Sequence, residues 1–184
     1  MSNHQFKSDI FHILKLTFGI ILWIYLAYLL YFLIFRYDPA NRTYNPPFII
    51  WVIDLINLFI HEAGHFFFKI FGKTIYYLGG SLMQIILPFV LFIVSVRSNL
   101  IHSFLPAFWT GESLINVSMY IKDAPYKQLK LISKNLTHDW NWILRNNLAM
   151  AETLSLMIFI CGLIFCVFSI AILGYSITMS ILRK

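Results

Sequence analysis

The sequence predicts an all-α protein, a polytopic bundle of about five transmembrane helices that forms a single domain over residues 1–184. Of these residues 59% are hydrophobic and only 12% are charged, whereas a soluble domain has about 45–50% apolar and about 25% charged residues. Apolar runs of the length that a spanning helix needs, about 20 residues, recur along the chain. The composition therefore excludes a soluble domain, and it excludes a disordered chain because such chains are rich in charge and poor in aromatic residues.

The first two predicted spans have clear boundaries. Residues 16–35 carry no charge and lie between Lys15 and Arg36. This run is too long for a signal-peptide core and no cleavage site of small residues follows it, so we interpret it as a spanning helix. A turn-rich loop with two consecutive prolines precedes the second span, about residues 48–71, and proline suits the first turn of a helix.

Three further segments complete the predicted bundle. Gly79-Gly80 is expected to form a turn, and residues 81–96 form the third span. A weaker fourth span covers about residues 99–121, and residues 122–147 are the largest polar region. The last span, about residues 150–182, is longer than a hydrocarbon core of about 30 Å requires, so its start is expected near the interface.

The net charge of +6 indicates membrane anchoring rather than a nucleic-acid surface, because the Lys and Arg residues lie at the ends of the apolar runs and in one polar loop. With five spans, nine of the 14 Lys and Arg residues fall on the N-terminal side. The positive-inside rule then predicts that the N-terminus is cytoplasmic. The lipid bilayer is an expected partner, and nucleic acid is not.

The second span carries the motif His61-Glu62-Ala63-Gly64-His65. On a helix, positions i and i+4 lie on one face one turn apart, so the two imidazoles can bind one metal ion, for which zinc is expected. Glu62 points to the flank of that face, where it can act as a general base on a metal-bound water. Ionisable residues are costly inside a span and usually carry function there, which favours a metal site over a chance polar cluster.

Two polar stripes accompany the motif and supply possible supporting residues, Asp54 and Asn116. Asp54 lies on the same face of the second span as the histidines, about 10 Å along the axis from His61. It can therefore make an interhelical hydrogen bond or line a water path, and both alternatives are equally favoured. On the fourth segment, Glu112, Asn116 and Asp123 share one face of a continuous helix, and this stripe could pack against the first.

A catalytic zinc site needs a third protein ligand and one open position. Asp123, at the end of the fourth segment, is favoured because that segment must pack beside the second span. His138 is the alternative. It lies in the polar region, next to Asp139 and Trp140, in an aromatic run of the kind found at membrane interfaces.

The segment from Phe59 to Phe66 resembles the metal-binding helix of the site-2 protease group of intramembrane zinc metalloproteases. The order of parts is also similar: a motif-bearing span, a Gly-rich turn, another span and a segment with Asn before Asp. In that group an Asp within an Asn…Asp-Gly motif is the third ligand. Asn116 and Asp123 match its Asn and Asp, whereas Ala124 replaces its glycine and its proline is missing. The chain also resembles small, uncharacterised bacterial membrane proteins with this metal motif, in Gly79–Leu82, Tyr120–Ala124 and His138–Trp140.

The resemblance implies a membrane-embedded zinc metalloprotease, a hydrolase of peptide bonds within or near the bilayer, in the bacterial cytoplasmic membrane. Its substrate would be a membrane protein or peptide that unwinds first, because the carbonyls of a helix are already hydrogen-bonded. The β-prone stretch Thr74–Leu78 could offer an edge strand to it, although a short connector is favoured. Two other classes stay open: a non-catalytic metal-binding scaffold or sensor, and an ion transporter that uses the polar stripes.

Overall fold

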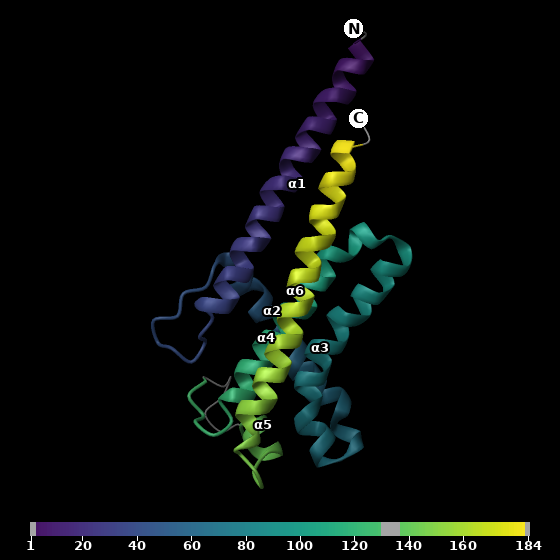
Figure 1. Ribbon diagram of the computed structural model, residues 1–184. Helices are drawn as coiled ribbons and strands as arrows, with labels where there is room; N and C mark the ends of the chain where they lie inside the picture. The colour runs from purple at the N-terminus through teal and green to yellow at the C-terminus, as the bar shows by residue number, and fades with distance from the viewer. Residues whose placement is uncertain (1–2, 130–136, 183–184) are drawn as a thin grey trace.

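The computed structural model describes residues 3–129 and 137–182, and this part of the chain is a bundle of helices without a β-strand (Figure 1). Residues 130–136 of the predicted polar region lie outside the described residues. The elements follow one another as α1 (Asn3–Phe35), α2 (Phe48–Phe68), η1 (Lys69–Phe71), α3 (Lys73–Ser98), η2 (Leu100–Ser103), α4 (Phe104–Lys122), α5 (Asp139–Ile143) and α6 (Met150–Leu182). The prediction of an all-α bundle is confirmed.

Four stretches of helix are long and apolar enough to cross a membrane: Ile10–Phe35, Phe48–Phe71, Lys73–Ser98 and Met150–Leu182. Many of their large apolar side chains are exposed on the outside of the bundle, as expected for contact with lipid. The predicted fourth span, residues 99–121, is divided between η2 and α4. Neither of these two elements belongs to the four stretches that could cross a membrane. Most of the second half of α4 is buried by its neighbours, so α4 is an internal helix of a membrane protein.

The connection between α2 and α3 differs from the predicted one. α3 begins at Lys73, directly after Gly72, whose φ of 91° lies in the left-handed region that favours glycine. The predicted turn at Gly79-Gly80 is wrong, because both glycines lie inside α3. Thr74–Leu78 is helical as well, so the edge strand considered for a substrate does not form there.

The two glycines of α3 allow it to pack closely on α2. A Cβ atom at Gly80 would lie 2.5 Å from Nε2 of His61, and one at Gly79 would lie 2.6 Å from Cβ of Phe68. Small residues at a helix crossing let two backbones approach in a membrane. The glycine pair therefore serves helix packing. In the sequence alone, two consecutive glycines are compatible with either a turn or a close helix crossing.

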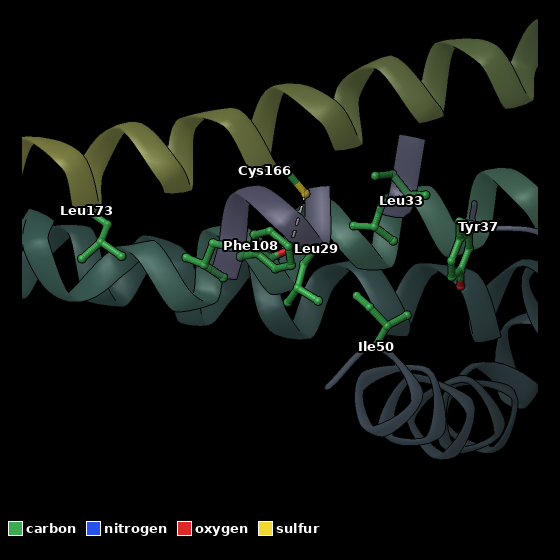
Figure 2. Packing of buried hydrophobic residues seen from close by; sticks show 9 residues of the cluster. Leu29, Leu33, Tyr37, Ile50, Phe108, Cys166 and Leu173 are labelled. Carbon is green, nitrogen blue, oxygen red and sulfur yellow. Dashed lines mark hydrogen bonds between the residues drawn. The ribbon is translucent and has the colours of Figure 1, made fainter. Parts of the chain in front are cut away.

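The larger apolar core joins α1, α4 and α6 with the start of α2 (Figure 2). Its most deeply buried members are at most 3% exposed: Leu29, Leu33, Ile50, Phe108, Ile115 and Cys166. A second cluster surrounds the C-terminal end of α4 and contains residues of α5 and α6: Val117, Ile121, Ala124, Trp140 and Ala151. This second cluster holds the short helix α5 beside the longer ones.

α1 and α5 lie at opposite ends of α6. Gly19 of α1 lies against Ile177, near the C-terminal end of α6. α5 packs near the start of α6, where Trp140 and Ala151 belong to one cluster. Figure 1 shows both chain termini at one end of the molecule and α5 at the other. The N-terminal part of α1 and the described residues around α5 therefore do not share an end, although the Lys and Arg count assumes that they do.

Candidate metal centre

Three side chains with metal-ligating atoms meet at the end of the bundle that carries α5. His61, His65 and Asp139 each offer one ligand atom, and these atoms lie within 4.8 Å of one another. Oδ2 of Asp139 is 3.0 Å from Nε2 of His61 and 3.2 Å from Nε2 of His65. The side chains of His61, His65 and Asp139 are only 10%, 12% and 7% exposed. We call these three residues the metal group.

α2 places the two imidazoles of the metal group on one face, one turn apart. Their ring centroids are 4.8 Å apart. Nδ1 of His65 is 2.8 Å from the carbonyl oxygen of Tyr76, which can only accept a hydrogen bond. Nδ1 therefore carries the proton, and in the neutral ring Nε2 of His65 has a lone pair for a ligand.

The position of Asp139 depends on α5, a helix of five residues that begins with it. Trp140 donates a hydrogen bond from Nε1 to Oγ of Ser81 in α3, at 3.0 Å. Trp142 stacks on Tyr77 of α3 with ring centroids 4.4 Å apart. These two contacts dock α5 on α3, and the docking brings Asp139 to the two histidines of α2.

A tyrosine of α4, Tyr120, orients the carboxylate of the metal group. Its hydroxyl accepts a hydrogen bond from the backbone N–H of Asp139 at 3.1 Å and donates one to Oδ2 of Asp139 at 3.2 Å. Burial raises the pKa of the Asp139 carboxyl, but the hydrogen bonds with His61 and His65 outweigh it and hold this pKa below its usual range. Asp139 is therefore an oriented carboxylate.

The two residues that the sequence offers as third ligand, Asp123 and His138, form a separate pair beside the metal group. Oδ2 of Asp123 is 3.3 Å from Nε2 of His138. The Asp123 carboxylate also accepts the backbone N–H groups of Gln128 and Leu129, at 2.8 Å and 2.9 Å, because α4 ends just before it and the chain turns there. Burial lowers the pKa of His138, and the Asp123 carboxylate only partly opposes this effect. The structure thus groups Asp139, and not Asp123 or His138, with the two histidines of α2.

A local signal for Asp139 exists in the sequence. Asp139 directly follows His138, which caps the N-terminus of α5 by accepting the backbone N–H of Asn141 at 3.2 Å. An acidic residue in the first turn of a helix is common. Two tryptophans that follow it give the short helix its anchors on α3. The sequence prediction named this run but favoured Asp123 as the third ligand and gave His138, the residue before Asp139, as the alternative.

Glu62 lies on the exposed side of α2, next to the metal group but outside it. Together with His65 it lines a cavity of about 520 Å³ between the end of α2 and the start of α3. The other lining residues are mostly aromatic or basic: Phe66, Lys69, Gly72, Lys73, Tyr76 and Tyr77. The metal group therefore has open space on the side of His65 and Glu62.

The predicted supporting residues Asp54 and Asn116 belong to a second polar cluster, between α2 and α4. Asn116 donates from Nδ2 to Oδ1 of Asp54 at 2.9 Å, and the hydroxyl of Tyr37 donates to the same oxygen at 2.6 Å. Asn57 of α2 donates to Glu112 of α4 at 2.7 Å. The prediction that the stripe on α4 packs against the stripe on α2 is confirmed for Glu112 and Asn116, whereas Asp123 pairs with His138 and the loop backbone. Of the two alternatives for Asp54, the structure contains the interhelical hydrogen bond.

The arrangement combines two imidazoles, an oriented carboxylate and a further carboxylate, Glu62, at the edge of a cavity. No protein-family model, curated protein or solved structure matches the chain. The chemistry of these four residues is therefore the main guide to the function.

Proposed function

We propose that this protein is a membrane-embedded zinc metallopeptidase that hydrolyses peptide bonds within or near the bilayer. The observation that carries the proposal is the convergence of His61, His65 and Asp139 next to a cavity that Glu62 lines. It is the chemistry that the resemblance to the site-2 protease group implies, with Asp139 as the third ligand in place of Asp123.

The ligand atoms of the metal group fit a catalytic zinc ion. Such an ion has three protein ligands, often two imidazoles and a carboxylate, and one open position. Tetrahedral ligands about 2.0–2.1 Å from an ion are about 3.3–3.4 Å apart. The Asp139 oxygen is 3.0 Å and 3.2 Å from the two imidazole nitrogens, close to that spacing. Tyr76 and Tyr120 add the hydrogen bonds that orient zinc ligands in proteins.

Glu62 is the general base of the proposed reaction. Within the described residues it makes no salt bridge, and it faces the cavity. Its carboxylate can therefore take a proton from the attacking water and deliver it to the leaving amine. A zinc ion bound to the metal group would lower the pKa of a bound water and polarise the substrate carbonyl.

The proposed substrate is a membrane protein or peptide in an unwound conformation, because the carbonyl groups of an intact helix are hydrogen-bonded. The aromatic side chains of Tyr76 and Tyr77 give the cavity apolar walls for such a chain. The proposed location is the bacterial cytoplasmic membrane. The count of Lys and Arg residues that predicts a cytoplasmic N-terminus places the polar region around α5 on the side of the N-terminus, whereas the two lie at opposite ends of α6, so the count does not support that orientation in this bundle.

The substitution Glu62→Gln tests the proposal, because it removes the base and leaves the metal group unchanged. The purified variant is expected to bind zinc like the wild type and to lose cleavage by about 100-fold or more. Membrane proteins that accumulate in cells with this variant are candidate substrates, and their cleavage by purified wild type is then measured. Glu152→Gln is the matched control, because Glu152 is exposed at the start of α6.

Each alternative function gives a different result. Cleavage at the wild-type rate by Glu62→Gln would end the peptidase proposal. Stoichiometric zinc in a wild type that cleaves no membrane protein would favour the non-catalytic scaffold or sensor. A wild type without zinc, unchanged by His61→Ala, would contradict the metal site itself.

A further inference from the structure

The carboxyl groups of Asp54 on α2 and Glu112 on α4 belong to one interhelical cluster, in which Asn116 donates to Asp54 and Asn57 donates to Glu112, and they are close enough to influence each other's ionisation. Glu112 is completely buried and Asp54 is half-buried. In the part of the chain that the structure describes, no Lys, Arg or His forms a salt bridge with either residue. We call Asp54 and Glu112 the carboxyl pair.

The neighbours of Glu112 determine which of its oxygens can carry a proton. Trp109 can only donate, and its Nε1 donates to Oδ1 of Asn57 at 2.9 Å. The hydroxyl of Ser113 donates to the same oxygen at 3.2 Å. The amide group of Asn57 must therefore turn its NH2 toward Glu112, where it donates to Oε2 at 2.7 Å. Because Oε2 accepts this bond, a proton on Glu112 belongs on Oε1.

The neighbours of Asp54 fix its oxygens in the same way. Gln84 donates to Oδ1 of Asn116 at 2.8 Å, so the NH2 of Asn116 faces Asp54. Burial and the two nearby carboxyl groups raise the pKa of the Tyr37 hydroxyl, which stays protonated and donates as well. Oδ1 of Asp54 thus accepts two hydrogen bonds, and a proton on Asp54 belongs on Oδ2.

One atom of this cluster has no partner. Oε1 of Glu112 is among only three buried side-chain nitrogen or oxygen atoms of the described residues without a hydrogen bond, and the hydroxyl of Tyr44, which also faces the pair, is another. The other titratable groups that face the pair are the Tyr37 hydroxyl and the thiol of Cys166 from α6, and none of these groups is a cation. A buried carboxylate oxygen without a donor is costly.

We propose that Asp54 and Glu112 hold one proton between Oδ2 of Asp54 and Oε1 of Glu112, and so form a proton-binding site inside the bundle. The proton turns one carboxylate into a hydrogen-bond donor and gives the unpartnered oxygen of Glu112 a hydrogen bond. It also changes the net charge of the pair from −2 to −1. Two adjacent carboxyl groups that no cation of the described residues pairs with favour this state, because like charges oppose ionisation and burial penalises it. The proposal is independent of the metallopeptidase function.

The proton has a structural consequence for the bundle. α2 packs mainly along α3, and α4 packs mainly along α6. The carboxyl pair and the two asparagines beside it, together with Trp109 and Ser113, make side-chain hydrogen bonds that join α2 directly to α4. Loss of the proton would place two negative charges at that junction, so the site couples proton binding to the contact between α2 and α4.

Isotope-edited infrared spectroscopy of the full chain in lipid nanodiscs tests the proposal. With ¹³C-labelled Asp and Glu carboxyl groups, the wild type at neutral pH is expected to show the C=O band of a protonated carboxylic acid. Asp54→Asn and Glu112→Gln are each expected to lose the band, because the new NH2 group replaces the proton as donor and the remaining carboxylate stays ionised. Glu152→Gln is expected to keep it.

Three results would overturn the proposal. The first is a wild type without the band at neutral pH, a measurement that needs no folded variant. The second is a band that persists in both Asp54→Asn and Glu112→Gln. The third is a band that disappears when sodium replaces potassium at constant pH, because the pair would then bind a metal cation and not a proton.

Discussion

The metal group and the carboxyl pair are built on the same helix, with His61 about two turns beyond Asp54 on α2, yet they are completed differently. Around the carboxyl pair, neighbouring side chains donate to Oδ1 of Asp54 and to Oε2 of Glu112, and Oε1 of Glu112 has no partner. In the metal group, three ligand atoms converge beside a cavity. The first arrangement suits a proton, and the second suits an ion and a substrate. Both clusters consist of buried polar side chains, so burial alone does not distinguish them. They differ in the nitrogen and oxygen atoms that remain free to bind a proton or a metal ion.

Removal of the Asp139 carboxylate from the metal group is expected to have the largest effect on zinc binding, the property that separates the metal group from the carboxyl pair. Asp139→Ala is expected to abolish stoichiometric zinc binding, a loss greater than the roughly 10–100-fold that removal of a supporting residue costs. Asp123→Ala is the matched control and should keep its zinc, because Asp123 pairs with His138 and the loop backbone. Zinc content and competition with a chelator measure both variants. Retention of zinc by Asp139→Ala together with its loss from Asp123→Ala would return the third position to Asp123.

An intermediate effect is expected from Gly80→Ala, which acts on the metal group through helix packing. The added Cβ would lie 2.5 Å from Nε2 of His61, so α3 and the imidazole must move apart. We expect a loss of about 1–3 kcal/mol in the free energy of unfolding, together with weaker zinc binding. Gly19→Ala on α1 is the control, because its Cβ would meet Ile177 at an ordinary 3.4 Å. Equal stability and zinc affinity in the two variants would show that the close approach at Gly80 does not position His61.

The smallest effect is expected when the carboxyl pair is changed and the metal group is measured. Asp54→Asn should leave the zinc affinity within about twofold of the wild type, because residues with no shared partner at this separation act almost independently. Chelator competition on the same preparation that is used for infrared spectroscopy gives the comparison. A large loss of zinc in Asp54→Asn would mean that the two clusters form one coupled network.

The parts of the site that the sequence predicts are those that lie on one regular helix. The spacing of His61 and His65 places both rings on one face whatever surrounds them, and the same periodicity places Asp54 near that face. The facing stripe on α4 follows from the positions of Glu112 and Asn116 in the same way. These relations need only the helical repeat, and the structure contains them.

The remaining parts depend on contacts between distant segments. Asp139 reaches the histidines because Trp140 and Trp142 dock α5 on α3, and no local pattern encodes that docking. The glycine pair of α3 signals either a turn or a close helix crossing, and only the position of His61 distinguishes the two. Asp123 has the residue type that the resemblance predicts for the third ligand. However, α4 ends just before it, and its carboxylate accepts hydrogen bonds from the loop backbone.

The distance along the chain between His61 and Asp139, 78 residues, has a consequence for biogenesis. During synthesis the two histidines enter the membrane with α2, while α3, α4 and α5 are still to be made. A ribosome must therefore add both intervening long helices before the third ligand exists. A nascent chain offers only the histidine pair, which holds a metal ion more weakly than the complete set of three. If the proposed zinc site forms, its stable loading is reserved for chains whose bundle has already assembled, and a truncated chain that ends before Asp139 stays without the complete group of three.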